Sequence, residues 1–248
     1  NPIILISKLA DLIKAECIYW NENIEPYEIN RDKIILEKLL KENRKVYTYL
    51  DQLIVNPSNI KTNNGEPYKV FGPFYRKWID IINQTKLIDG NLIKVSSTPA
   101  RITGLENEEI SSIKSSDLKY CIIRKVDAVY DLLSSNRFKN TDLCPCKPGE
   151  SESIKQLNFF IGSGMINSYD QSRDIPSLET TSTLSAALSL GTISCRAVWN
   201  GAQISKNMTT DENQTNSIHT WIKELAWREF YQNVLINFPA LEKGPYRE

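Results

Sequence analysis

The sequence predicts an α/β region in its N-terminal part and an all-helical region in its C-terminal part. Two observations lead to this fold class. Between residues 3 and 50, apolar residues at helical spacing alternate with short β-branched and aromatic runs, which is the rhythm of a parallel sheet covered by helices. From residue 150 onward, apolar residues recur at helical spacing and no run reads as a strand.

Two helices and two strands are predicted in the α/β region. Apolar residues at helical spacing cover residues 3–14 and 34–40, while residues 17–20 form a short buried strand and residues 46–50 a second strand. Two strands are too few for a free-standing sheet of this kind. The chain also begins at Asn1 without a methionine. We therefore expect an excerpt of a longer protein whose other strands precede this sequence.

The chain between the two regions carries weaker signals. Pro73 suits the first turn of a helix that runs to about Asn83. The buried face of this helix would consist of Phe74, Trp78, Ile81 and Ile82. No long period follows, and we interpret that stretch as an inter-domain connection. The predicted domains are therefore an α/β domain at 1–88, a linker at 89–150 and a helical domain at 151–248.

Three helices are predicted between residues 150 and 210. The first has an apolar face made of Ile154, Leu157, Phe160 and Ile161. The second is short, contains Leu184 and Leu188, and ends at Gly191, which is a natural C-cap. Ser194 stands at the start of the third.

A long helix is predicted to start after Ser217, whose side chain suits an N-cap. One stripe of this helix and its flanks mix aromatic and charged side chains: Trp221, Glu224, Trp227, Arg228 and Tyr231. Indoles beside charges suit a pocket that stacks on planar rings and hydrogen-bonds their edges. The alternative is an ordinary core that contains both tryptophans, with Glu224 and Arg228 as a surface ion pair.

Composition argues against several classes of protein. The 30 basic and 30 acidic side chains among 248 residues give zero net charge, so the totals do not announce a nucleic-acid binder, although a local basic patch is compatible with them. No apolar run approaches the roughly 20 residues of a membrane span, and no secretory signal is visible. Five cysteines and a single histidine support neither a disulfide scaffold nor a zinc site. We expect no metal and a reducing, cytoplasmic setting.

Hydroxyl side chains cluster at residues 180–185, where the short helix is predicted to begin. Free backbone N–H groups, the helix dipole and the hydroxyls would together hold a phosphate-sized anion. The alternative is ordinary Ser/Thr capping of an apolar helix. No glycine-rich nucleotide-binding loop occurs, so any dinucleotide would have to be held by helices.

Short blocks in a consistent order extend over nearly the whole chain. The first are Trp20-Asn21, Glu25-Pro26-Tyr27, Arg31-Asp32, Pro67–Phe71, Pro73-Phe74 and Trp78. The others are Pro148-Gly149-Glu150, Tyr169, Arg173-Asp174, Pro176, Thr181-Ser182, Leu184-Ser185, Gly191, Ile193-Ser194, Arg196, Glu224-Leu225 and Trp227–Tyr231. This set resembles the DNA photolyase and cryptochrome family. The form of its last block is most similar to class I photolyases of cyclobutane pyrimidine dimers and differs from the (6-4) branch.

The resemblance implies a truncated, Rossmann-like parallel α/β domain, a linker and a truncated all-α domain that binds FAD. In such enzymes the light-excited, reduced flavin donates an electron to a pyrimidine dimer flipped out of UV-damaged DNA, and the dimer splits. A reduced flavin needs shielding from water, which suits an apolar helical cavity. The resemblance also implies a monomer without membrane contact and, in some members, an antenna chromophore, methenyltetrahydrofolate or a deazaflavin.

Roles carry over from the family position by position. The residues expected to contact FAD are Tyr169, Thr181, Ser182, Thr183, Leu184, Ser185, Trp221, Glu224 and Arg228. Those expected to contact DNA are Glu224, Trp227, Arg228 and Tyr231. The catalytic pair would be Trp227, stacked on the dimer, and Glu224, bound to its base edge. Glu66 matches a position near the antenna, and Thr183 stands where relatives often carry a basic residue.

Two other functions stay open. One is a cryptochrome-like blue-light photoreceptor that binds FAD and signals through protein partners, although the presence of both Glu224 and Trp227 argues against it. The other is a helical interaction domain whose aromatic stripe is an ordinary core. Because the resemblance covers only the middle part of a photolyase, we expect this segment by itself to be inactive.

Overall fold

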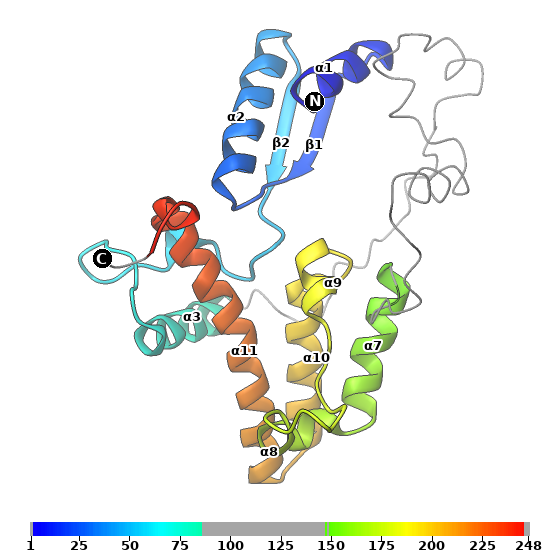
Figure 1. The fold of residues 1–248 in the computed structure, drawn as a ribbon, viewed down its shortest axis with the longest axis vertical. Helices are drawn as coiled ribbons and strands as arrows, with labels where there is room; N and C mark the ends of the chain where they lie inside the picture. The colour runs from blue at the N-terminus through cyan, green and yellow to red at the C-terminus, as the bar shows by residue number, and fades with distance from the viewer. Residues whose placement is uncertain (1, 86–146, 148, 246–248) are drawn as a thin grey trace. The chain divides into compact units, whose positions relative to one another are not determined.

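The computed structural model describes residues 2–85, 147 and 149–245, so the linker predicted at 89–150 lies almost entirely outside the described residues. The helices and strands in chain order are α1 (Pro2–Leu12), β1 (Cys17–Asn21), α2 (Pro26–Lys41), β2 (Lys45–Tyr49), α3 (Phe71–Thr85), α7 (Glu150–Gly162), α8 (Tyr169–Ser172), α9 (Ser185–Leu190), α10 (Cys195–Met208) and α11 (Glu212–Asn237) (Figure 1). Short 3-10 turns lie at Pro57–Asn59, Met165–Ser168 and Pro239–Glu242. The predicted fold class, α/β followed by all-helical, is confirmed.

The described residues pack as two compact units. The first contains residues 2–20 and 30–48, and the second contains 21–29, 49–85 and the helical part from 147 onward. Helix α3 thus packs with the helical unit, because its aromatic residues Phe74 and Trp78 join the same buried cluster as α11. The domain boundaries predicted at 88 and 150 stay predictions.

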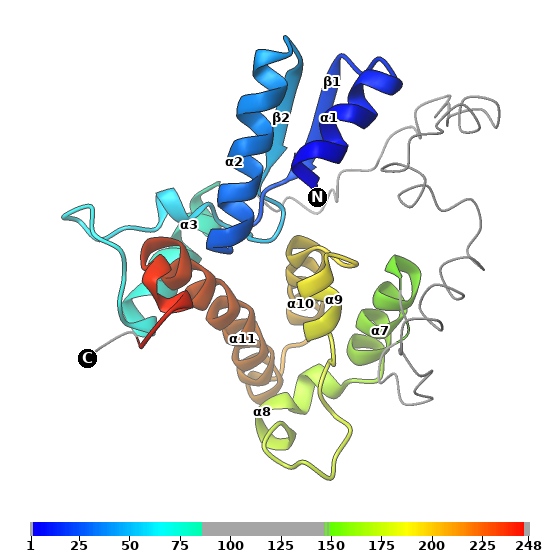
Figure 2. The same ribbon diagram turned by 45° about the horizontal axis from the view of Figure 1, so that its top comes forward.

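In the first unit, β1 and β2 are neighbours and run in the same direction (Figure 1). Figure 2 shows α1 and α2 alongside the two strands. The helices cover the sheet face that carries Ile18, Trp20 and Val46. The opposite face carries Tyr19 and Tyr47, which are exposed and stack with their ring centroids 4.9 Å apart. The prediction that the first strand is buried is therefore wrong, since among the described residues helices cover one of its faces only.

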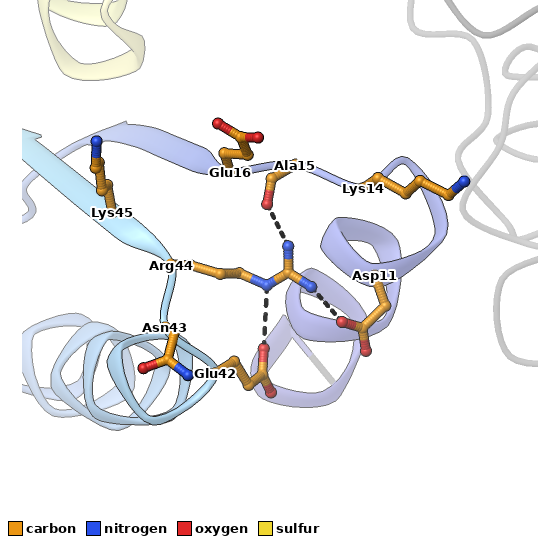
Figure 3. Close-up of a pocket in the computed structure, with 8 residues that line it drawn as sticks. All are labelled: Asp11, Lys14, Ala15, Glu16, Glu42, Asn43, Arg44 and Lys45. Carbon is orange, nitrogen blue, oxygen red and sulfur yellow. Dashed lines mark hydrogen bonds and ion pairs between the residues drawn. The ribbon is translucent and has the colours of Figure 1, made fainter.

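Arg44 ties the end of α1 to the start of β2 (Figure 3). Its guanidinium donates to the backbone oxygens of Ala10, at 3.2 Å, and Ala15, and pairs with the carboxylates of Asp11 and Glu42. A cation at the carboxyl end of a helix satisfies its free carbonyl groups. Arg44 lines an open cavity of about 440 Å³. Because Asp11 and Glu42 neutralise its positive charge, we interpret Arg44 as a structural residue.

Helix α11 is the central element of the second unit. It lies against α3, α8 and α10, and the views agree that α3 and α10 flank it (Figures 1 and 2). Its buried residues are Ser217, Ile218, Trp221, Ile222, Leu225, Ala226, Glu229, Phe230, Asn233 and Val234. A helix with neighbours on several sides needs buried residues around much of its circumference, so it carries no single narrow apolar stripe.

The start of α11 differs from the prediction. The helix begins at Glu212, and the carboxylate of Asp211 caps it by accepting hydrogen bonds from two backbone N–H groups of the first turn, at 2.7 and 3.1 Å. Ser217 lies inside the helix and is fully buried, and its hydroxyl donates to the carbonyl of Ile166 at 2.9 Å. Ser217 is thus a tertiary contact rather than an N-cap.

The shorter helices follow the sequence more closely. Gly191 ends α9 in the left-handed region, with φ of 69°, and the Ser194 side chain caps α10, as predicted. Helix α3 begins at Phe71, so Pro73 lies in its first turn as predicted, and its predicted buried face is confirmed. Ile154 does not belong to the buried face of α7, because 42% of its surface remains exposed.

Within the described ranges, no helix combines the length and apolar character of a membrane span. No three His, Cys, Asp or Glu side chains in those ranges gather to hold a metal ion. Cys17 and Cys195 are free thiols, and burial raises the pKa of Cys195 to about 12. Cys195 is therefore a thiol held neutral by its apolar surroundings.

Candidate functional site

The predicted cofactor and DNA contacts come from three segments of the second unit: α8, the stretch 180–185 and α11. Tyr169, Leu184 and Trp221, one from each segment, belong to a single buried cluster. Trp221 is only 3% exposed, and its ring lies 5.2 Å from that of Phe160, centroid to centroid. The fold brings the three segments together, but one side of the Trp221 ring is packed against the protein's own core.

Glu224 is held by a residue from the turn after α8. Arg173 Nη1 donates to Glu224 Oε1, and the two side chains remain 30% and 36% exposed. The guanidinium carbon of Arg173 also lies 5.4 Å from the centre of the Tyr169 ring, within the range of a cation–π contact. The hydrogen bond to Glu224 raises the pKa of Arg173. Two predicted site residues, Tyr169 and Glu224, are therefore linked by one cation.

The hydroxyl stretch before α9 is accessible. Thr181, Thr183 and Ser185 are exposed, and Ser182 is half-buried. Thr180 Oγ1 is buried and has no hydrogen-bond partner in the part of the chain that the structure describes. Helix α9 is six residues long and has no side-chain N-cap, so its dipole is too small to carry the predicted anion site. The side-chain hydroxyls are what a ligand would meet here.

Thr183 adopts a left-handed backbone conformation, with φ of 48°. This region is costly for a β-branched residue and is found where the surrounding structure imposes it. Gln156, from α7, donates to the Thr183 hydroxyl at 3.0 Å and to the carbonyl of Ser182 at 3.3 Å. The turn is thus held in place by α7.

Trp227 already has an aromatic neighbour. Its ring stacks on Phe71, at the start of α3, with centroids 3.6 Å apart and planes inclined by 7°. Tyr231, one turn further along α11, lies 5.6 Å from Trp227 and is 64% exposed. Since Trp227 is half-buried, part of its ring remains accessible to a planar ligand.

Arg228 makes its hydrogen bonds within the protein. Nη1 donates to the carbonyl of Gln52 at 2.6 Å and to Gln232 Oε1 at 3.2 Å, and Nη2 donates to the carbonyl of Leu188 at 3.3 Å. The guanidinium therefore joins α11 to the segment after β2 and to α9. Its predicted contact with FAD or DNA stays a prediction.

Glu229 was part of the family block, but no role was predicted for it. Its carboxylate is 2% exposed and accepts hydrogen bonds from Ile54 N at 2.5 Å, Val55 N at 3.3 Å and Trp78 Nε1 at 2.7 Å. Burial raises its pKa to about 7, against the effect of these hydrogen bonds and of Arg228. The sequence did offer one signal, a charged residue on the buried side of a helix. It did not identify the hydrogen-bond partners, because they are distant in sequence.

Two cavities adjoin the α9–α10 connection. One, of about 590 Å³, lies between α7 and α10 and has Ile154, Ile161 and Ile204 in its wall. The other, of about 190 Å³, is lined by Arg228 together with Gln52 and the end of α9. Neither is lined by Trp221, by Glu224 or by the hydroxyl stretch. Neither is therefore the predicted pocket that would stack on planar rings. Glu66 lies in an exposed turn and lines neither cavity.

Comparison with known proteins gives consistent matches. The DNA photolyase family model matches residues 1–89. A deoxyribodipyrimidine photo-lyase of Synechococcus is 33% identical over 247 residues, which cover 100% of this chain and 47% of that protein. An uncharacterized 31.6 kDa protein from another Synechococcus strain is 30% identical over 230 residues, covering 93% of this chain and 72% of it. The chain spans about half the length of the photo-lyases it matches.

Solved structures agree in fold. A class III photolyase from Agrobacterium tumefaciens matches with a TM-score of 0.68 and 26% identity, covering 100% of this chain and 46% of that one. A cryptochrome from Synechocystis matches with a TM-score of 0.63, covering 96% of this chain and 45% of that one. At 16% identity, the cryptochrome match shows the fold alone. The class I assignment stays a prediction.

Proposed function

This chain belongs to the DNA photolyase family, and we propose that it forms part of a light-driven, FAD-dependent enzyme that splits cyclobutane pyrimidine dimers in UV-damaged DNA. The observation that carries the proposal is the similarity to a deoxyribodipyrimidine photo-lyase over the whole chain, at 33% identity. This similarity includes the helical unit, where the predicted site residues lie. The proposed class is I, from the form of the Trp227–Tyr231 block.

The hydroxyl stretch fits the phosphates of FAD. Thr180 carries a buried hydroxyl without a partner among the described residues, and such an atom is normally satisfied in a complete site. Phosphate oxygens accept hydrogen bonds from hydroxyl groups. The residues proposed to hold FAD are Tyr169, Thr181, Ser182, Thr183, Leu184, Ser185, Trp221, Glu224 and Arg228. Bound FAD would supply the light-driven one-electron chemistry, which no side chain of the protein provides.

Glu224 and Trp227 are the residues proposed to meet the damaged bases. An ionised carboxylate accepts a hydrogen bond from the N–H edge of a pyrimidine, and an indole stacks on its ring. Phe71 supports Trp227 from one side, which keeps the indole in a fixed orientation. Turning a dimer out of the duplex costs least where base pairing is already damaged. Tyr231, exposed beside Trp227, and Arg228 are proposed as further DNA contacts.

The proposal has three further features. An antenna chromophore, methenyltetrahydrofolate or a deazaflavin, is proposed near the exposed carboxylate of Glu66. A monomer is proposed from the resemblance to the family, and a reducing, cytoplasmic setting from a cysteine content that does not suggest a disulfide scaffold. These features do not affect the proposed chemistry.

The proposal is tested by Trp227→Ala in the complete, flavin-loaded enzyme of which this chain is proposed to form part. Lost stacking should weaken binding to an oligonucleotide with one thymine dimer by about 1–3 kcal/mol and leave binding to undamaged DNA nearly unchanged. Fluorescence anisotropy with both oligonucleotides measures this. Phe159→Ala removes an aromatic ring from α7 that is 58% exposed, and it serves as the matched control.

Two results would count against the proposal. If Trp227→Ala and the wild type bind the damaged oligonucleotide equally well, Trp227 has no stacking role. If the complete wild-type enzyme does not prefer damaged over undamaged DNA and does not restore thymines under blue light, the proposed function is wrong as a whole.

A further inference from the structure

Arg173 joins a residue proposed to contact FAD with one proposed to contact both FAD and the damaged base. It comes from the turn after α8, donates to Glu224 Oε1 on α11, and lies over the ring of Tyr169 at 5.4 Å. Tyr169 is a proposed FAD contact and Glu224 a proposed contact of the damaged base. Asp174 adds a weaker contact, 3.4 Å from Arg173 Nε.

The ion pair fixes one oxygen of Glu224 and leaves the other available. Oε1 accepts the hydrogen bond from Arg173, whereas Oε2 accepts none from the residues that the structure describes. Both side chains remain about one-third exposed, at 30% and 36%, so a ligand can approach them. The carboxylate is therefore oriented before a ligand arrives.

We propose that Arg173 is a positioning residue that holds Glu224 Oε1 so that Oε2 faces an N–H donor on the edge of the bound pyrimidine. The identity of this ligand rests on the proposed function. Without Arg173, the Glu224 side chain would sample several rotamers, and binding would have to select one of them. The planar guanidinium also presents its N–H donors in a fixed geometry, which suits a carboxylate.

The strength of this pair should depend on what occupies the site. In the ligand-free protein it is partly exposed, and such pairs stabilise a fold very little. A bound ligand excludes water and lowers the local dielectric constant, so the same pair becomes stronger. The effect of removing Arg173 should therefore appear in ligand binding and hardly at all in the melting temperature.

A double-mutant cycle tests this in the complete, flavin-loaded enzyme of which this chain is proposed to form part. The variants are Arg173→Gln, Glu224→Gln and the combination, and the readout is the dissociation constant for an oligonucleotide with one thymine dimer. We expect each single change to weaken binding about five- to tenfold and the double variant to be no weaker than Glu224→Gln alone. Arg173→Lys should recover part of the loss, because a lysine donates a charged hydrogen bond without the planar geometry.

The control removes a comparable ion pair elsewhere. Lys155 pairs with Glu152 at 2.6 Å on the surface of α7, and Lys155→Gln should leave the dissociation constant unchanged. The salt dependence of binding gives a second readout. If Arg173 acts only through Glu224, its removal in the Glu224→Gln background leaves the slope of affinity against salt unchanged.

Independent, additive losses in the cycle would overturn the proposal. So would a salt slope that falls by about one when Arg173 is removed in either background, because that result marks a direct contact with a phosphate. The wild type separates these outcomes from failure of the proposed function. If it shows no preference for the dimer, both proposals are wrong, whereas additive losses together with such a preference reject the positioning role alone.

Discussion

At the scale of single residues, Glu229 has the most specific surroundings in the second unit. Its carboxylate is buried and receives three hydrogen bonds from the segment after β2 and from α3. Arg228 is the nearby cation, and Cys195 faces the same region with a thiol kept neutral by burial. Despite these hydrogen bonds, burial raises the pKa of Glu229 to about 7. The free energy of unfolding should therefore depend on pH through the protonation of this carboxyl group.

The direction of this pH dependence follows from the raised pKa. The folded protein binds a proton at Glu229 more tightly than the unfolded chain, in which the pKa is about 4.5. The stabilising contribution is therefore complete below pH 4.5 and is lost as the pH rises to 7 and above. We expect it to be on the order of 3 kcal/mol. Urea unfolding of wild type and Glu229→Gln, followed by tryptophan fluorescence between pH 4.5 and 8.5, measures the difference.

Glu242→Gln is the control for this experiment. Glu242 is an exposed carboxylate just after α11, so its removal should leave the pH profile of the wild type intact. If Glu229→Gln keeps the same pH profile as the wild type, Glu229 titrates normally and its three hydrogen bonds outweigh burial.

Single residues differ in how far their roles could be predicted from the sequence. Gly191 and Ser194 were predicted as caps because their signals are local: one backbone conformation and one hydroxyl. The role of Glu229 was not predicted, because Ile54 and Trp78 lie about 150 or more positions away and nothing local identifies them. The Arg173–Glu224 pair was missed for the same reason.

At the scale of elements, close contact between α7 and α10 depends on Gly201. A Cβ atom at this position would lie 2.7 Å from Ile161 Cδ1 and 3.5 Å from the two δ-carbons of Leu157. The absence of a side chain therefore lets the two helices approach. Helical periodicity predicted α7 and α10, but it did not predict which face of each meets the other.

Gly201→Val should reveal this close approach. Its branched side chain cannot avoid Ile161 and Leu157 together, so overpacking should destabilise the second unit by about 1–3 kcal/mol. Gly162→Ala is the matched control at the end of α7, where a Cβ atom would have no neighbour within 4 Å, and it should change stability by less than about 0.5 kcal/mol. Urea unfolding at pH 7 measures both. A Gly201→Val protein as stable as the wild type would mean that Ile161 moves aside freely.

Two wrong predictions have their causes at the element scale. Ser217 has the residue type of an N-cap, but Asp211 lies at the true start of α11, and tertiary packing buries Ser217 instead. The first strand was predicted to be buried because of its apolar composition. Among the described residues helices cover only one face, and Tyr19 occupies the other. The composition of this segment predicts a strand. Whether one or both faces of the strand are covered depends on the rest of the fold.

At the scale of the molecule, the family was predictable because its blocks occur in order over nearly the whole chain. The match to a photo-lyase at 33% identity and the TM-score of 0.68 with a photolyase structure agree with that prediction. Neither of the two cavities beside α9 is the predicted pocket for planar rings, because Trp221 lines neither of them. The ring of Trp221 packs on Phe160 instead. Among the described residues, the hydroxyls of Thr181, Thr183 and Ser185 are exposed, and the side chains of the Arg173–Glu224 pair are about one-third exposed.

A site whose residues are open to solvent should bind its cofactor weakly. Thr181, Thr183 and Ser185 are exposed, whereas tight sites enclose about 70–90% of a ligand's surface. We therefore expect the 248-residue chain by itself to bind FAD with a dissociation constant above about 10 μM, because few contacts offset the loss of ligand freedom. Equilibrium dialysis with FAD measures this directly, and Thr181→Val should weaken the residual binding further if the hydroxyl stretch contacts the ligand. A chain that retains one FAD per molecule at sub-micromolar affinity would contradict the prediction.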